Sequence, residues 1–214
     1  MTFFNSFKRS AAELKDVRCL AVTAVLIALD LVLKQFATIE VTKDLKISFA
    51  FLALASIGML YGPVVSLMAG TVTDLIGFFL TPNMGAFNPM YTLIEAAGAM
   101  IYGIYLYNLR FSGFNKTKKF TTGNDLKGIM RIVLAKVTVI VVCNLLLTPL
   151  ANIITRSMEA GVLIYAPTLA AYPARVIKNL IQCPVDCVLL AAVLPVISTA
   201  YNSVFKKARI TVND

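Results

Sequence analysis

Charged side chains inside otherwise apolar segments are the residues of this sequence best placed to do chemistry. They are Asp30, Asp74, Glu95, Lys136, Arg175, Lys178 and Asp186. In hydrocarbon such a charge costs on the order of several kcal/mol unless it is paired or hydrated. Two uses are open to these residues: lining a cavity that binds a polar ligand, or pairing with one another, for instance Asp74 with Arg175, to hold helices together.

Other chemistries are excluded by what the sequence lacks. There is no histidine, so neither a Cys/His zinc site nor a Ser-His or Cys-His nucleophile is available. No glycine-rich loop followed by Lys-Ser or Lys-Thr occurs, so the chain cannot hydrolyse ATP by itself. We therefore expect no metal, no cofactor and no enzymatic activity; a membrane enzyme would have to use Asp74 and Glu95 as its reactive pair.

The composition is that of a membrane protein. The chain is 58% hydrophobic and 14% charged, with a mean hydropathy of +0.79, and its long apolar runs match the thickness of a bilayer. A soluble all-α core is the alternative, but it would have almost no polar surface. We expect an all-α integral membrane protein whose single domain, residues 1–214, is a compact bundle of six transmembrane helices. The expected spans are residues 18–35, 48–62, 63–80, 91–109, 129–154 and 172–203.

The connections between spans differ in a way that suggests where a ligand binds. Gly62-Pro63 is a minimal turn, whereas residues 81–89 form a loop rich in Pro, Asn and Gly. The alternation in residues 37–42 favours a short β-hairpin in the first outer loop. The more elaborate end is the expected ligand-binding end, where residues 36–46, 81–90 and 155–171 gather.

Lysine and arginine predict the orientation. Six spans place the N-terminus, the Gly62-Pro63 turn, residues 110–127 and the C-terminus on one side, and most of the 20 basic residues lie there. Because basic loops stay on the cytoplasmic side, both termini are expected to be cytoplasmic. The net charge of +9 follows from this asymmetry and requires no nucleic-acid partner.

Polar and charged residues near the expected outer ends could line one outward-facing cavity. They are Asp74, Asn83, Asn88, Tyr91, Glu95, Arg175, Lys178 and Asn179. In the first span, Ala21, Ala24 and Ala28 are spaced by three and four residues and share one helix face. Such a face allows another helix to approach closely in lipid, although alanine is also common in membrane helices.

Two stretches resemble a known family. Residues 45–107 contain LKISFAFLALASIGMLYGPVVSLMAGTVTDLIGFFLTP and YTLIEAAGAMIYGIYLY, and residues 174–190 read ARVIKNLIQCPVDCVLL. These stretches resemble the S component, the vitamin-capturing subunit, of energy-coupling-factor (ECF) transporters, specifically its folate branch. The last stretch matches that branch's Arg-x-x-Lys-Asn-Leu-Ile pattern, and the alanine face matches the family's docking motif.

The resemblance implies a receptor of the bacterial cell membrane that binds a vitamin outside and delivers it inward with a coupling subunit and two ATPases. A folate's pterin would stack on Phe49, Phe51, Phe87 or Tyr91 and bond to Asn83, Asn88 or Asp74. Its glutamate tail would meet cations, which are Lys43, Lys46, Arg175 and Lys178.

The folate branch usually carries Phe-Pro-Gly-Phe-Thr before the fourth span, where this chain has Phe87-Asn88-Pro89-Met90-Tyr91-Thr92. Pantothenate, riboflavin or a pterin precursor are therefore alternative ligands. A stand-alone secondary transporter is the other alternative, although such a protein would need internal repeats that the two halves of this chain do not show.

Overall fold

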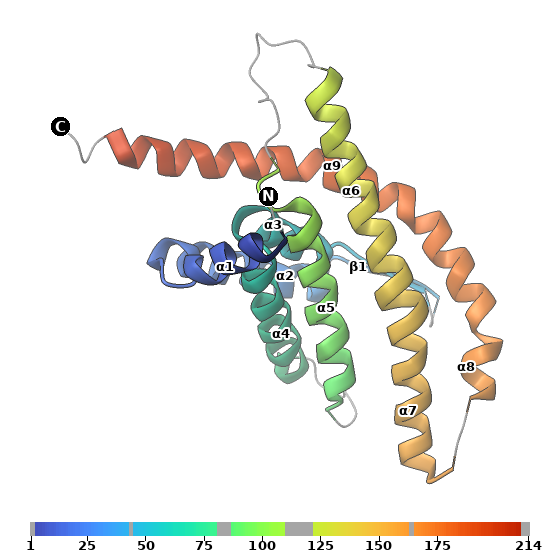
Figure 1. Cartoon of the computed structure of the whole chain (residues 1–214). Helices are drawn as coiled ribbons and strands as arrows, with labels where there is room; N and C mark the ends of the chain where they lie inside the picture. The colour runs from blue at the N-terminus through green and yellow to red at the C-terminus, as the bar shows by residue number, and fades with distance from the viewer. Residues whose placement is uncertain (1–2, 43–44, 81–86, 110–121, 163–164, 211–214) are drawn as a thin grey trace.

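The computed structural model of the chain describes residues 3–42, 45–80, 87–109, 122–162 and 165–210, and nearly all of them are helical. In chain order the elements are α1 (Phe3–Glu13), α2 (Val17–Phe36), β1 (Thr38–Thr42), β2 (Leu45–Ser48), α3 (Phe51–Tyr61), α4 (Pro63–Leu80), α5 (Pro89–Leu106), α6 (Thr122–Val139), the π-helix η1 (Ile140–Leu147), α7 (Thr148–Ala160), α8 (Ala166–Ala170) and α9 (Tyr172–Ile210) (Figure 1).

Helices occupy each stretch in which a span was expected, with some differences in their ends. Among the described residues, three helical segments are long and apolar enough to cross a membrane: Pro63–Leu80, Leu126–Met158 and Tyr172–Val204. Helix α3 is apolar but has only 11 residues, because β2 ends at Ser48 and the helix begins only at Phe51. Helix α7 runs beyond residue 154 to Ala160 and stops at Gly161, whose φ of 68° lies in the left-handed region that often ends helices.

Helices α3, α4 and α5 form a tightly packed group in which glycines let the backbones touch. A Cβ added to Gly103 of α5 would lie 2.5 Å from Cα of Pro63, and one added to Gly58 would lie 2.7 Å from the backbone nitrogen of Gly103. Farther along α4, a Cβ on Gly70 would lie 2.9 Å from Cβ of Ala99. This close approach is the small-residue packing by which helices associate in lipid.

The turn between α3 and α4 is the single residue Gly62, with a φ of 87° that glycine adopts without strain. Helix α1 packs against this turn. The Oγ of the fully buried Ser10 accepts hydrogen bonds from the backbone nitrogens of Val64 at 3.0 Å and Val65 at 3.3 Å. A serine from another helix thus caps α4, whose first backbone N–H groups have no partner within their own helix.

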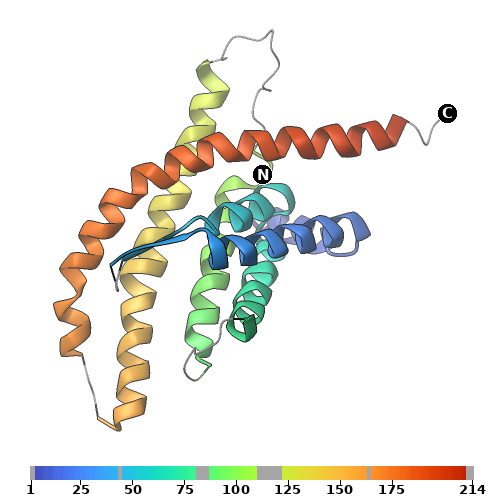
Figure 2. The same cartoon turned by 180° about the vertical axis from the view of Figure 1, so that it is seen from behind.

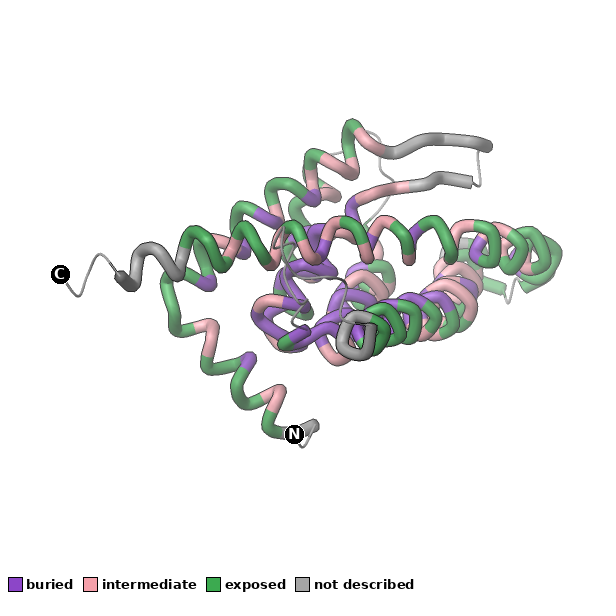
Figure 3. The backbone as a smooth tube through the Cα atoms, turned by 90° about the horizontal axis from the view of Figure 1, so that it is seen from above, coloured by how far each residue is buried: buried purple, intermediate pink, exposed green. Residues whose placement is uncertain are grey.

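The helices do not all run side by side. Seen from above, α1 and α2 form a V across the axes of α3, α4 and α5 (Figure 3). Helix α9 contains Pro184 and Pro195 and bends along its length, so that its C-terminal part passes across one end of the molecule (Figures 1 and 2). Proline inside a helix removes a backbone hydrogen bond and produces such bends.

Helices α6, η1 and α7 form one continuous rod (Figure 1). In η1 the helix is wider than an α-helix, and at its end both the backbone nitrogen and Oγ1 of Thr148 donate to the carbonyl oxygen of Cys143, the latter at 2.7 Å. The next residue, Pro149, has no backbone N–H to donate. Local π-helical turns are often found at functional sites.

Strands β1 and β2 pair antiparallel, with Ile39 opposite Ile47. They project toward the side of the molecule where α8 and α9 begin (Figures 1 and 2). These strands occupy the connection between α2 and α3, the segment in which the sequence alternation favoured a hairpin.

Candidate functional site

Polar side chains join α5 to α7 where α5 begins and α7 approaches its end, in the lower part of Figure 1. Asn88 caps α5 by accepting a hydrogen bond from the backbone nitrogen of Met90 at 3.0 Å. Its amide nitrogen donates to Oγ1 of Thr155 on α7. One turn farther, the Tyr91 hydroxyl donates to Oδ1 of Asn152 at 2.5 Å. The structure therefore brings two predicted ligand residues, Asn88 and Tyr91, to the same neighbouring helix.

The two predicted carboxylates, Asp74 and Glu95, lie apart from that pair and bind different partners. Oδ2 of Asp74 accepts from Oγ1 of Thr92 at 2.6 Å, which joins α4 to α5. Oε1 of Glu95 lies 2.9 Å from Nζ of Lys34, which is also 3.1 Å from Oδ2 of the fully buried Asp30. Glu95 thus joins α5 to α2, and this ion pair accounts for its position in an apolar segment.

A third polar connection links the π-helical segment to α9. The amide nitrogen of Asn144 in η1 donates to Oδ1 of the buried Asn179 at 2.7 Å, and the amide nitrogen of Asn179 donates to the carbonyl oxygen of Arg175 at 2.9 Å. The guanidinium of Arg175 is half-buried and, among the described residues, makes no hydrogen bond or ion pair. Lys178 is also half-buried, one turn along the same helix.

The most deeply buried charge pair lies farther from this end. Nζ of Lys136 on α6 is 2.7 Å from Oδ2 of Asp186 on α9, and their side chains are 8% and 1% exposed. The same ammonium lies 4.4 Å from the centroid of the Phe51 ring, a distance at which a cation is attracted to an aromatic face. Phe51, which was expected to stack on a ligand, therefore contacts Lys136.

Among the remaining predicted ligand residues, the structure describes the side chains of Phe87 and Phe49 but not those of Lys43, Lys46 and Asn83. The ring of Phe87 is 42% exposed and packs edge-on against Phe78, with centroids 5.2 Å apart. Phe49 is half-buried just before α3. Lys43 and Asn83 lie outside the described residues, and only the backbone of Lys46, in β2, is described.

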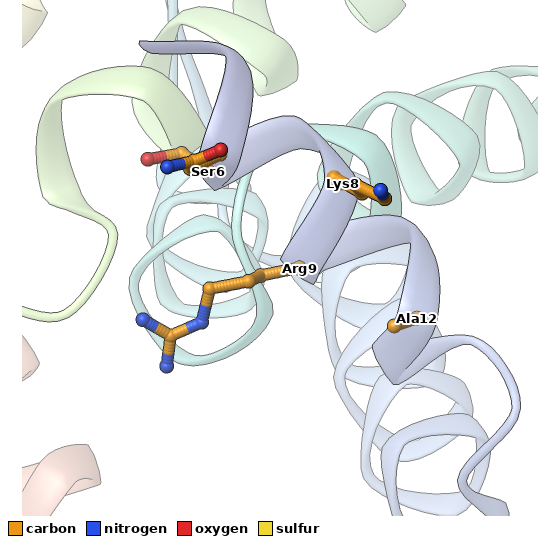
Figure 4. A pocket seen from close by; sticks show the side chains of 5 residues that line it. Ser6, Lys8, Arg9 and Ala12 are labelled. Atoms are coloured by element: carbon orange, nitrogen blue, oxygen red, sulfur yellow. The ribbon is translucent and has the colours of Figure 1, made fainter. Parts of the chain in front are cut away.

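Two of the surface hollows formed by described residues are lined by no predicted ligand residue. One, of about 350 Å³, lies along α1 and is lined by Asn5, Ser6, Lys8, Arg9 and Ala12 (Figure 4). The other, of about 370 Å³, lies on α7 near Gly161.

The alanine face of α2 is exposed on the surface of the chain. Ala21, Ala24 and Ala28 are all exposed, whereas Thr23, Leu26 and Asp30 on the same helix are buried. The three alanines therefore do not serve the internal packing of this chain.

Sequence reasoning missed several partners in these connections, namely Lys34, Thr92, Asn144, Asn152 and Thr155. Each is a polar residue in or beside an apolar segment, and that was the available signal. The predicted site residues are ionisable residues inside spans and asparagines and aromatics at the outer ends, a set that does not include uncharged residues in mid-span such as Asn144.

Residues 18–194 match the family described as ECF transporter, substrate-specific component. The match covers most of the chain, which belongs to this family. It is a family of transporter subunits, not of enzymes. Together with the apolar helices, membership makes the chain a multi-pass membrane protein.

Curated relatives of the chain are folate transporters. It is 34% identical over 99 residues to the folate transporter FolT of Clostridium novyi (strain NT), a match that covers 46% of this chain and 56% of that protein. It is 28% identical over 171 residues to FolT of Leuconostoc mesenteroides subsp. mesenteroides, which covers 80% of this chain and 81% of the relative.

A solved structure is similar to this chain in both fold and sequence. The crystal structure of FolT bound with folic acid superposes with a TM-score of 0.61 at 32% identity, covering 82% of this chain and 91% of the other.

Proposed function

We propose that this protein is the folate-capturing S component of an ECF transporter. The observation that carries the proposal is its combined sequence and structural similarity to FolT in the folic acid-bound state, which extends over most of both chains. The two longer curated alignments, to FolT of Leuconostoc mesenteroides and of Streptococcus mutans serotype c, support the same function.

The proposed topology is one domain with six spans and both termini in the cytoplasm. Helices occur at each expected span, and the basic residues concentrate at the ends that this topology makes cytoplasmic. The beginning of α5, the end of α7 and the beginning of α9 then face outward.

The proposed binding site lies at that outer end. Arg175 carries a half-buried guanidinium there that has no partner among the described residues, and a guanidinium binds a carboxylate through charge-assisted hydrogen bonds. Lys43, Lys46, Lys178 and Asn179 complete the polar part of the proposed site. Asn88, Tyr91, Phe87, Phe49, Asn83 and Asp74 remain candidates for contact with the pterin. Phe51 and Glu95 each contact a cation of the chain, Lys136 and Lys34 respectively, so we assign them a weaker role.

The proposed partners are a membrane coupling subunit and two ATP-hydrolysing subunits, with Ala21, Ala24 and Ala28 as the docking face. Their exposure on α2 supports this assignment. Ala24→Trp or Ala28→Trp should abolish ATP-dependent uptake in the full transporter and leave folate binding by the isolated protein intact. Loss of binding, or normal uptake, would remove the alanine face from the docking site.

Calorimetric titration of the purified protein with folic acid, pantothenate and riboflavin tests the ligand. We expect tight binding of folic acid alone; preference for another vitamin would contradict the folate assignment. Uptake into vesicles by the protein without ATPase subunits would instead favour a secondary transporter.

The role of Arg175 is tested with the same assay. Arg175→Ala should weaken folic acid binding roughly ten- to a hundredfold, the effect of losing a charge-assisted hydrogen bond, and should weaken binding of a pterin without the glutamate tail much less. Arg156→Ala is a matched control, since Arg156 is an exposed arginine on α7. Equal losses for both ligands would mean that Arg175 does not bind the tail.

A further inference from the structure

Helix α1 has two different faces. Asn5, Lys8, Arg9 and Ala12 are spaced by three or four residues, so they lie on one face, and together with Ser6 they line the hollow of about 350 Å³ (Figure 4). The opposite face is fixed to the protein through the buried hydroxyl of Ser10. Because Ser10 caps α4, α1 is held against the start of that helix, and Arg9 lies near Tyr107 at the end of α5.

The two cations of this hollow form no ion pair among the described residues, although Glu13 lies one turn after Arg9 on α1. Lys8 and Arg9 are exposed, and neither makes a hydrogen bond or ion pair with another residue in the part of the chain that the structure describes. None of the lining residues is acidic. The nearby Asp16 caps α2 by accepting from the backbone nitrogen of Arg18 at 3.0 Å. The hollow therefore offers two positive charges and the hydroxyl of Ser6 to an anion.

Apolar surface begins directly after this basic region. At the start of α2, Val17 is 76% exposed and Leu20 is 51% exposed. A phosphate group bound at Lys8 and Arg9 would thus lie beside exposed apolar side chains, which acyl chains could contact. Few soluble anions carry a long apolar part beside a phosphate, whereas a phospholipid combines a charged headgroup with acyl chains.

We propose that the hollow on α1 binds the headgroup of an anionic phospholipid, with Lys8 and Arg9 as the phosphate ligands and the start of α2 beside the acyl chains. Basic residues at a membrane surface each contribute about 1 kcal/mol to the attraction of anionic lipid. Two of them correspond to a preference of roughly tenfold or more for an anionic over a zwitterionic headgroup. This lipid site is separate from the folate site and does not depend on it.

Native mass spectrometry of the purified full-length protein, titrated in detergent with phosphatidylglycerol or phosphatidylcholine, tests the proposal. Wild type should retain phosphatidylglycerol at least tenfold more tightly than phosphatidylcholine. The double variant Lys8→Gln/Arg9→Gln should lose that preference. Lys15→Gln/Arg18→Gln is the matched control, because it removes the same charge from exposed positions outside the hollow, and it should keep most of the preference.

Equal losses in the two double variants would overturn the proposal, since general electrostatic attraction would then explain the result. Displacement of phosphatidylglycerol by millimolar inorganic phosphate would also overturn it, because the hollow would then be a site for free anions. Folic acid binding, measured in parallel, should stay unchanged in both variants. A failure of the folate assignment would therefore appear in the wild type, independently of the lipid result.

Discussion

The α3–α5 group and the pair α6 and α9 show two ways of joining helices in a membrane. In the α3–α5 group, glycines bring backbones into contact, as at Gly103, and the buried residues are mostly small. Between α6 and α9, the Lys136–Asp186 ion pair adds a buried charged connection to a core that includes Ile132 and Leu190. Around it many apolar side chains remain exposed, including Leu180 and Val188 on α9.

The difference predicts how each region responds to substitution. Close backbone packing is sensitive to added volume, since a core has no room for an extra methyl group. A buried ion pair is sensitive to the loss of one charge, because the other charge is left without a partner. Added volume should therefore destabilise the α3–α5 group most, and loss of a charge should destabilise the α6–α9 pair most.

The largest expected effect is at the ion pair. Lys136→Met leaves the buried Asp186 carboxylate unpaired and should lower stability by about 3–5 kcal/mol, seen as a large fall in melting temperature in detergent. The double variant Lys136→Met/Asp186→Leu should recover much of the loss, because it removes both charges. Equal melting temperatures for the single and double variants would show that the charges are not coupled.

The next effect is at the closest backbone contact. In Gly103→Ala the new methyl group would lie 2.5 Å from Cα of Pro63 and 2.6 Å from Oγ of Ser66. Overpacking of this kind costs about 1–3 kcal/mol. Gly77→Ala is the matched control, since the nearest atom to its methyl group would be Cδ2 of Leu31 at 3.7 Å. If both variants melt alike, close packing does not determine the stability of the α3–α5 group.

A smaller effect is expected where α1 is attached to that group. Ser10→Ala removes the acceptor for the backbone nitrogens of Val64 and Val65 and should cost about 1 kcal/mol, as for other helix caps. Trypsin should then cleave after Arg9 faster than in wild type. Thr71→Ala also removes a hydroxyl from α4, but that hydroxyl bonds within its own helix, so cleavage should not change. An unaltered cleavage rate in Ser10→Ala would mean that the cap does not hold α1.

The smallest effect should come from the neutral connection between η1 and α9. Asn144→Leu deletes the donor to Asn179, and hydrogen bonds between membrane helices contribute about 0.6 kcal/mol on average. Asn202→Leu, which removes a bond within α9 only, is the control. A loss at Asn144 as large as that at Lys136 would erase the distinction between charged and neutral connections in this region.

Much of the local structure could be predicted from the sequence. Gly62-Pro63 ends α3 and begins α4 as the dipeptide indicates, and α5 begins at Pro89, two residues before the expected start of its span. These features depend on a few neighbouring residues, whose conformational preferences are local.

The partners of the buried charges could not be predicted in the same way. The sequence placed Asp74 and Glu95 inside spans, but it did not reveal that Asp74 meets Thr92 or that Glu95 meets Lys34. A helical repeat tells which residues share a face and says nothing about which face of a neighbouring helix lies opposite. The sequence therefore predicts which residue types form the proposed site and at which end of the molecule they lie. It does not predict which side chains contact each other.

The single-residue turn at Gly62 has a consequence for how the protein enters the membrane during synthesis. Helix α3, with its 11 residues, is about 16 Å long at 1.5 Å per residue, roughly half the thickness of the hydrocarbon core of a bilayer. It cannot bridge the bilayer alone, and the turn leaves no slack for it to wait outside while α4 inserts. We therefore expect α3 and α4 to insert together as one hairpin.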